Sequence, residues 1–356
     1  MAEGGVDVAV FGRPASVLFA SGARQLWTAG ARPFGPACVV VQATGRVHLL
    51  STWDEGVPAE IGHDELFGLS WNPTVIASRL AAIPGLAAAA SVATDGLSPG
   101  AGQLLRALCP SASIVDAGPL LDAVRVPKSD DELACIVTAA AVAEAALVVM
   151  AQAAEPGVTE RHFVAVYLET IASLGAPTPP TEAVATATGS RSGPGSGSRP
   201  IGRLATDRPL GPGDVVALSP GAFYAGYEAT LARTAVVGGG AGVVASAAQR
   251  AAAVRCRQGL EQLVAGCRPG ASGADLGRAW SVAAPEPSSG FFVRGIGLGA
   301  EPPVIGPAVG QSAVLQAGTV LSVETWVGGV VQADLVLVRD EAKVLTRLGS
   351  GPLING

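Results

Sequence analysis

Apolar and polar positions follow two different patterns along the chain, and the change falls near residue 125. Before it, short apolar runs at 38–41 and 47–50 flank the polar stretch 43–46, a spacing typical of a β-hairpin. Helical patterns follow at 72–82 and 100–108. They alternate with short apolar runs at 91–93 and 113–115. Alternating helices and strands indicate βαβ units, so residues 1–125 are predicted to form an α/β domain.

After residue 125 the pattern changes to long helices followed by blocks of strands. Two consecutive helices are predicted at 131–154 and 159–174. Strand-like blocks at 215–237 and 320–338 flank a further helix near 245–265. This order predicts an α+β domain over residues 126–356.

The first of these helices is also the one segment that resembles a membrane span. Ser129 fits its N-cap, and Glu132, three residues later, completes a capping box. Residues 133–154 are long and apolar enough to cross a bilayer, but Glu144 lies near their middle, where a charge is costly. We therefore expect a buried core helix in a cytoplasmic protein, with no membrane partner and no signal peptide at the start of the chain.

Composition supports a compact protein and excludes some partners. The 356 residues are 49% hydrophobic and 15% charged, enough for two domains with a large core. The net charge of −6 gives no basic surface for nucleic acid. Five cysteines show no CxxC spacing, so free thiols are expected.

The most specific motif lies in residues 212–238. Its frame is Gly213-Asp214, Gly226-Tyr227 and Arg233-Thr234. This frame resembles the metal-binding segment of the pita-bread superfamily, which includes methionine aminopeptidase, aminopeptidase P, prolidase and creatinase. The resemblance is clear over 120–350 and loose before it. It implies a pita-bread C-terminal domain and a smaller, creatinase-type α/β N-terminal domain.

The resemblance also implies five positions at which the family binds two divalent cations with two Asp, one His and two Glu. In this chain those positions hold Ser219, Thr230, Arg294, Glu324 and Ala333. Hydroxyl groups are poor replacements for carboxylates on a divalent cation. We therefore expect no metal and no other cofactor, and we expect Arg294 to neutralise Glu324 as a bidentate partner.

Creatinase shares this fold and works without metal, so chemistry at the pocket remains a hypothesis. The catalytic candidates are Glu324 as general base, then Arg294, Glu228 and Asp334. Glu228 precedes Thr230 by two residues, so on a strand both share one face. The ligand-binding candidates in the second domain are Ser219, Tyr227, Thr230, Arg233, Glu301 and Trp326.

Two further features concern the mouth of the pocket. In creatinase the partner subunit's first domain supplies an aromatic residue and an arginine, and Arg32 and Phe34 lie in a similar stretch. If this stretch has the same role here, the protein is a homodimer in which Arg32 and Phe34 reach the partner's pocket. The alternative is that the stretch is a simple turn between two strands. The Gly/Ser/Arg-rich segment 189–203 is either a surface loop or a source of ligand contacts through Arg191, Arg199 or Arg203.

Three functions follow from these features. The first is a metal-independent enzyme, a hydrolase or lyase acting on a small amino-acid-like, amide or guanidino compound. The second is a non-catalytic pseudopeptidase that binds a small ligand or a protein partner. The third, a genuine Xaa-Pro aminopeptidase, requires metal ligands that these five positions lack.

Overall fold

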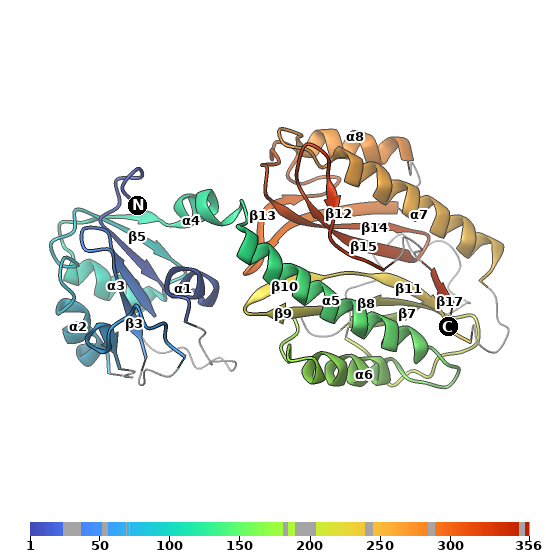
Figure 1. The fold of residues 1–356 in the computed structure, drawn as a ribbon, viewed down its shortest axis with the longest axis horizontal. Coiled ribbons are helices and arrows are strands. Elements are labelled where there is room, and N and C mark those ends of the chain that lie inside the picture. Colours follow the sequence, from blue (N-terminus) through green and yellow to red (C-terminus); the bar gives the residue numbers. More distant parts are fainter. Residues whose placement is uncertain are drawn as a thin grey trace. The chain divides into compact units, whose positions relative to one another are not determined.

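The computed structural model describes residues 1–23, 37–51, 56–68, 70, 72–180, 184–188, 204–238, 245–283, 289–348 and 353–355. The chain divides into two compact units, Met1–Val124 and Arg125–Gly356. Figure 1 shows the elements of both. Each unit is described by itself.

The first unit is built on a six-stranded sheet with the order β4-β3-β2-β1-β5-β6. The predicted hairpin at 38–50 is confirmed, because Cys38 pairs with Leu49 and Val41 with Arg46 in antiparallel register. Parallel pairing of β1 with β5 and of β5 with β6 confirms the βαβ pattern. The elements are β1 (Val8–Phe11), α1 (Pro14–Ser21), β2 (Cys38–Val41), β3 (Arg46–Leu50), η1 (His63–Glu65), β4 (Leu66–Phe67), α2 (Pro73–Ala81), β5 (Ser91–Asp95), α3 (Pro99–Leu108), β6 (Ser113–Asp116) and α4 (Gly118–Arg125), which ends one residue past the division.

The second unit contains two sheets, a short hairpin and four helices within the described residues. The first sheet has the order β17-β11-β8-β7, the hairpin joins β9 and β10, and the second sheet has the order β13-β12-β14-β15-β16. The elements are α5 (Asp130–Gln152), α6 (Glu160–Ser173), β7 (Val184–Thr188), β8 (Val215–Ser219), β9 (Gly221–Tyr224), β10 (Tyr227–Thr230), β11 (Arg233–Val236), α7 (Ala247–Gly266), α8 (Gly273–Ala283), β12 (Ser289–Gly297), β13 (Gly299–Ile305), β14 (Val320–Val327), β15 (Val330–Leu337), β16 (Lys343–Val344) and β17 (Leu353–Asn355).

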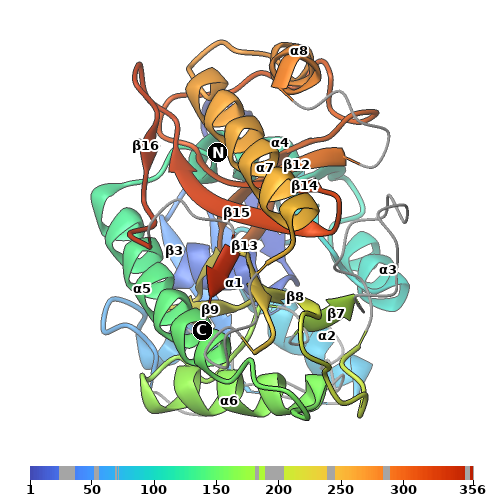
Figure 2. The ribbon, with the colours of Figure 1, turned by 90° about the vertical axis from the view of Figure 1, so that its right-hand side faces the viewer.

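The five-stranded sheet has two faces with different partners, and this difference decides where each candidate side chain lies. On one face, here called the outer face, Val293, Val323 and Val336 join the core formed with α7 and α8. On the other, the inner face, Ile296 and Leu335 pack with α5 and β10. Figures 1 and 2 show α7 lying along the outer side of β14 and β15, with α5 and α6 on the opposite side of the unit.

Helix α5 begins at the predicted capping box. The Ser129 N–H donates to Glu132 at 2.8 Å, and the Glu132 N–H donates to the Ser129 hydroxyl at 3.3 Å. The helix passes the length and hydropathy test for a membrane span, and half of its most apolar window is buried within the protein. Glu144 is buried, and its carboxylate accepts a hydrogen bond from the Leu348 N–H at 2.8 Å. This acidic residue thus anchors the segment that follows β16.

Candidate functional site

Three side chains from β10 and β12 form a compact polar cluster in the second unit. The Arg294 guanidinium donates from both Nη atoms to the Glu228 carboxylate, with Nη1 3.2 Å from Oε2. Nη2 also donates to the Thr230 hydroxyl at 3.3 Å, and that hydroxyl donates to Glu228 Oε1 at 2.7 Å. The Arg294 side chain is 17% exposed and the Glu228 side chain 4%. The cluster is a largely buried, internally neutral ion pair with a hydroxyl between its members.

The β9–β10 hairpin places Glu228 and Thr230 in this cluster. Its two-residue turn has Ala225 at φ 50° and Gly226 at φ 86°, as a tight primed turn requires. In β10 the two residues are two apart, so they share one face, and the hydrogen bond between them confirms that prediction. At Gly221, opposite Thr230, a Cβ would lie 2.8 Å from the Ala229 carbonyl oxygen, so the pairing requires glycine there.

Glu324 lies on the inner face of the sheet, on the strand next to Arg294. Arg294 pairs in register with Ser322, and Glu324 pairs with Phe292 on one side and Ala333 on the other. Glu324 is buried, at 6% exposure. The expectation that Arg294 is the bidentate partner of Glu324 is wrong, because the guanidinium turns across to β10 and binds Glu228 instead.

Two further candidates are Trp326 on β14 and Ser219 on β8. Trp326 follows Glu324 by two residues and packs against a small apolar cluster that includes Ala217 and Ala333. The ring covers Gly290, where a Cβ would lie 2.2 Å from Trp326 Cζ2. Ser219 is the partly buried last residue of β8, in register with Val184.

Asp334, predicted as a catalytic candidate, is not on the inner face. It pairs with Val323, whose side chain lies in the outer core, whereas the adjacent Ala333 pairs with Glu324. Strand pleating sends neighbouring side chains to opposite faces, which is the reason for this correction. The Asp334 carboxylate is held by Arg233 at 2.7 Å and by the Thr346 hydroxyl at 2.8 Å.

Arg233, Tyr227 and Glu301, predicted as ligand-binding residues, make structural contacts instead. Arg233 is 1% exposed and donates from Nη1 to the carbonyls of Ala232 and Ala333, both at 2.8 Å. The Tyr227 hydroxyl points to α5 and donates to Glu132 at 3.0 Å. Burial, then the Glu132 charge, raises the pKa of Tyr227 well above its usual range.

Glu301 belongs to a second buried ion cluster, at the start of the second unit. Its carboxylate binds Arg125 Nη2 at 2.7 Å and Lys128 Nζ at 2.6 Å, and the Lys128 side chain is only 1% exposed. The cluster ties the residues that precede α5 to β13. Sequence analysis missed Lys128 and Arg125 as the partners of Glu301, since more than 170 residues separate them.

The family of this chain follows from comparison with known proteins. The model of metallopeptidase family M24 matches residues 134–345, which is more than half of the chain. The chain belongs to metallopeptidase family M24. A comparison with the curated proteins gives no significant match.

Solved structures confirm the pita-bread fold for this M24 protein. The X-Pro aminopeptidase from Thermotoga maritima superposes with a TM-score of 0.80 at 18% identity, covering 99% of this chain and 97% of that one. The prolidase from Pyrococcus horikoshii OT3 gives a TM-score of 0.77 at 18% identity, covering 98% and 96%. The Xaa-Pro dipeptidase from Bacillus anthracis gives 0.78 at 18% identity, covering 99% and 96%. At these identities the likeness shows the fold alone.

In this M24 protein the described residues contain no group of three His, Cys, Asp or Glu side chains placed to hold a metal ion. The three histidines lie elsewhere: His48 on β3, His63 on η1 and His162 on α6. Arg32, Phe34 and the arginines of 189–203 lie outside the described residues.

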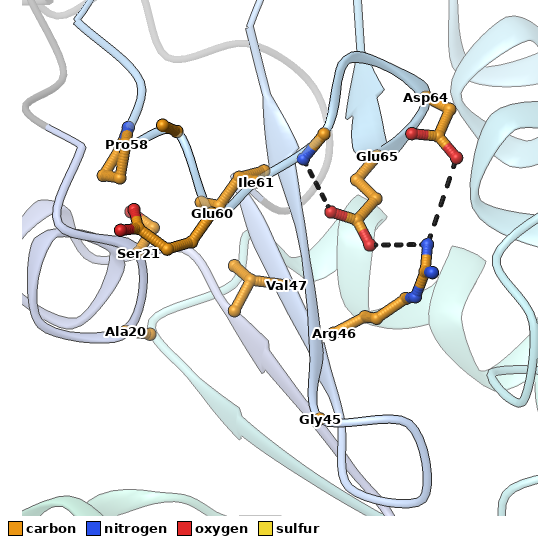
Figure 3. Close-up of a pocket in the computed structure, with 12 residues that line it drawn as sticks. Ala20, Ser21, Gly45, Arg46, Val47, Pro58, Glu60, Ile61, Asp64 and Glu65 are labelled. Carbon is orange, nitrogen blue, oxygen red and sulfur yellow. Dashed lines mark hydrogen bonds and ion pairs between the residues drawn. The ribbon is translucent and has the colours of Figure 1, made fainter.

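The first unit has a cavity of its own, lined only by residues of that unit. It encloses about 560 Å³, and Ser21, Val47 and Ile61 line it (Figure 3). Arg46 closes one side through an ion pair with Glu65 at 2.9 Å. The two carboxylates beside Arg46, Glu65 and Asp64, give this cavity an ionic wall rather than a catalytic set.

Proposed function

We propose that this M24 protein works without a dinuclear metal centre and that the inner-face residues around Arg294, Glu228 and Glu324 bind a small ligand. The observation that carries the proposal is the bond between Arg294 and Glu228, because the chain itself supplies a cation beside this carboxylate. A dication bound here would meet a fixed positive charge.

The residues at the five ligand positions do not fit two metal ions. Ser219 and Thr230 offer hydroxyl groups and Ala333 offers no donor. The Thr230 hydroxyl is already engaged by Arg294 and Glu228. Divalent cations of this kind prefer several charged oxygen or imidazole ligands, and Glu324 alone is one carboxylate.

Binding without turnover is better supported than catalysis. A general base must reach the proton that it removes. The Glu228 carboxylate already accepts hydrogen bonds from Arg294 and Thr230. Asp334 lies on the outer face, where it pairs with Arg233. Catalysis remains a second candidate because Glu324 is a buried carboxylate on the same face as Arg294. In that case it acts as the base on a small amino-acid-like, amide or guanidino compound.

Metal analysis tests the first part of the proposal. Purified protein incubated with Mn²⁺, Co²⁺ or Zn²⁺ and then desalted is expected to retain less than stoichiometric metal. Adding the same ions is expected to leave its melting temperature unchanged. Retention of one or two ions per chain, or Xaa-Pro cleavage that depends on added metal, overturns the proposal.

A variant that restores the donor set provides the matched control. The fourfold change Ser219→Asp, Thr230→Asp, Arg294→His and Ala333→Glu recreates two Asp, one His and two Glu around Glu324. If the five positions are assigned correctly, this variant gains Mn²⁺ binding that the parent lacks. If it does not fold, metal analysis of the parent still decides the matter.

Ligand screening separates binding from turnover. A panel of amino-acid derivatives, amides and guanidino compounds is tested by thermal shift, and each binder is then followed by NMR for conversion. Unchanged compound over a day supports the binding function. Conversion that Glu324→Gln abolishes, while the fold and ligand affinity persist, supports the enzyme instead.

A further inference from the structure

Two neighbouring residues of β10 are held by different parts of the second unit. Glu228 binds Arg294 of β12, whereas the Tyr227 hydroxyl donates to Glu132 of α5 at 3.0 Å. In the described part of the chain, the β9–β10 hairpin pairs with neither of the two larger sheets of this unit. Side-chain contacts such as these, together with apolar packing on α5, therefore set where Glu228 meets Arg294.

The acid that holds Tyr227 is itself fixed at the start of α5. Glu132 accepts from the Tyr227 hydroxyl through Oε1 and from the Ser129 N–H through Oε2, the latter at 2.8 Å. Ser129 follows Lys128, whose Nζ lies 2.6 Å from Glu301 Oε2 and whose side chain is 1% exposed. A shift of the start of α5 therefore breaks a buried ion pair, which is costly.

The backbone of Glu301 leads back to the strand that carries Arg294. Glu301 pairs in register with Gly295, the residue next to Arg294 on β12. The two backbones are in close contact, because a Cβ at Gly295 would lie 2.7 Å from the Glu301 carbonyl oxygen and 2.1 Å from that of Pro302. The contacts thus form a closed path, here called the site ring. Its members are Glu301, Lys128, Glu132, Tyr227, Glu228 and Arg294.

We propose that Tyr227 is a positioning residue, which holds Glu228 against Arg294. Through Glu132 it couples this pair to the buried ion pair at the start of α5. Because β12 pairs with β13 and with β14, the backbone of Arg294 is fixed on both sides, so the hairpin is the part that can shift. The inference rests on the proposed function, since the residues that Tyr227 positions are among those proposed to bind the ligand.

The NMR signals of the Arg294 guanidinium test this proposal in the ¹⁵N-labelled full chain, without a ligand. Tyr227→Phe removes the hydroxyl and keeps the ring. It is expected to shift the Arg294 Nε–H signal and to speed its hydrogen exchange about tenfold, the equivalent of one lost hydrogen bond to a charged group. Tyr224→Phe, at the exposed tyrosine that ends β9, is the control and is expected to change neither. Arg294 signals that are the same in Tyr227→Phe and in the parent overturn the proposal.

Further variants separate positioning from a general loss of stability. Glu301→Gln removes the charge at the other end of the site ring and is expected to speed the same exchange. Because both changes act through one ring, the double variant with Tyr227→Phe is expected to exchange more slowly than the product of the single effects predicts. Glu160→Gln, at a fully buried carboxylate that binds the Ala187 N–H, is expected to leave the Arg294 signals unchanged.

Two results contradict the coupling. One is independent effects of Tyr227→Phe and Glu301→Gln. The other is a change in Glu160→Gln as large as that in Tyr227→Phe, which assigns the effect to stability alone. Tyr227→Phe removes a single oxygen atom, so the test stands even if Glu301→Gln folds poorly. Metal retention and ligand screening test the proposed function separately, so either conclusion can fail without the other.

Discussion

Removing the Arg294 guanidinium is expected to destabilise the second unit strongly. Arg294→Met keeps most of the side-chain volume but leaves the Glu228 carboxylate, 4% exposed, without its cation. Breaking a buried pair in this way costs about 3–5 kcal/mol. The low end applies, because Arg294 is 17% exposed and Glu228 keeps its bond from Thr230. We expect a loss of about 3 kcal/mol in the free energy of unfolding.

Unfolding in guanidinium chloride, followed by circular dichroism, measures this loss. A double-mutant cycle then gives the interaction energy between Arg294 and Glu228. Arg294→Met, Glu228→Gln and the double variant are compared with the parent. Since the double variant removes both charges, it is expected to be more stable than the sum of the single losses predicts. Arg278→Met, which removes one member of the exposed Arg278–Asp275 pair, is the control. If Arg294→Met costs no more than this control, or the coupling energy is near zero, the buried-pair argument is refuted.

Two further predictions concern buried polar groups outside the Arg294–Glu228 cluster. Burial raises the pKa of Tyr167 to about 12, so the folded state resists its ionisation. Stability is therefore full below the unfolded pKa near 10 and falls as pH rises toward 12. Tyr167→Phe is expected to flatten this alkaline loss in pH-dependent melts, whereas the exposed control Tyr224→Phe is not; equal slopes contradict the assignment. Glu160 is fully buried and accepts from the Ala187 and Thr206 N–H groups, both at 2.9 Å. Glu160→Ala is expected to lower the free energy of unfolding by about 1–3 kcal/mol for each backbone N–H that it leaves without an acceptor. Unfolding curves measure this cost against the exposed Glu169→Ala, and a difference below 1 kcal/mol would falsify it.

Local rules predicted local structure well. The capping box at Ser129 and Glu132 depends on residues three apart, and both of its hydrogen bonds form. The shared face of Glu228 and Thr230 depends only on the two-residue period of a strand. The same two-residue period places neighbouring side chains on opposite faces of a strand. It therefore predicts that Asp334 lies on the face opposite Ala333, and Tyr227 on the face opposite Glu228. Those two misplaced candidates were therefore avoidable from the sequence.

The partner of Arg294 was beyond such rules. Position 294 is 66 residues from Glu228 and 64 from Thr230, and no hydrogen-bonded strand pairing joins β10 to β12. Their contact depends on how the β9–β10 hairpin packs against the five-stranded sheet. Sequence reasoning instead paired Arg294 with Glu324, the one carboxylate among the five positions that the resemblance implies. The acid that binds Arg294 lies outside those positions altogether.

This arrangement gives a physical reason for a hydroxyl at position 230. An aspartate there would place two carboxylates, at 228 and 230, against the single charge of Arg294, and a buried excess charge is costly. Threonine accepts one hydrogen bond from Arg294 and donates one to Glu228, so every member is satisfied and the cluster stays neutral. Arg294 and Thr230 therefore complement each other in this cluster. Either change alone, a histidine at 294 or an aspartate at 230, leaves a buried charge unmatched unless a metal ion enters with it.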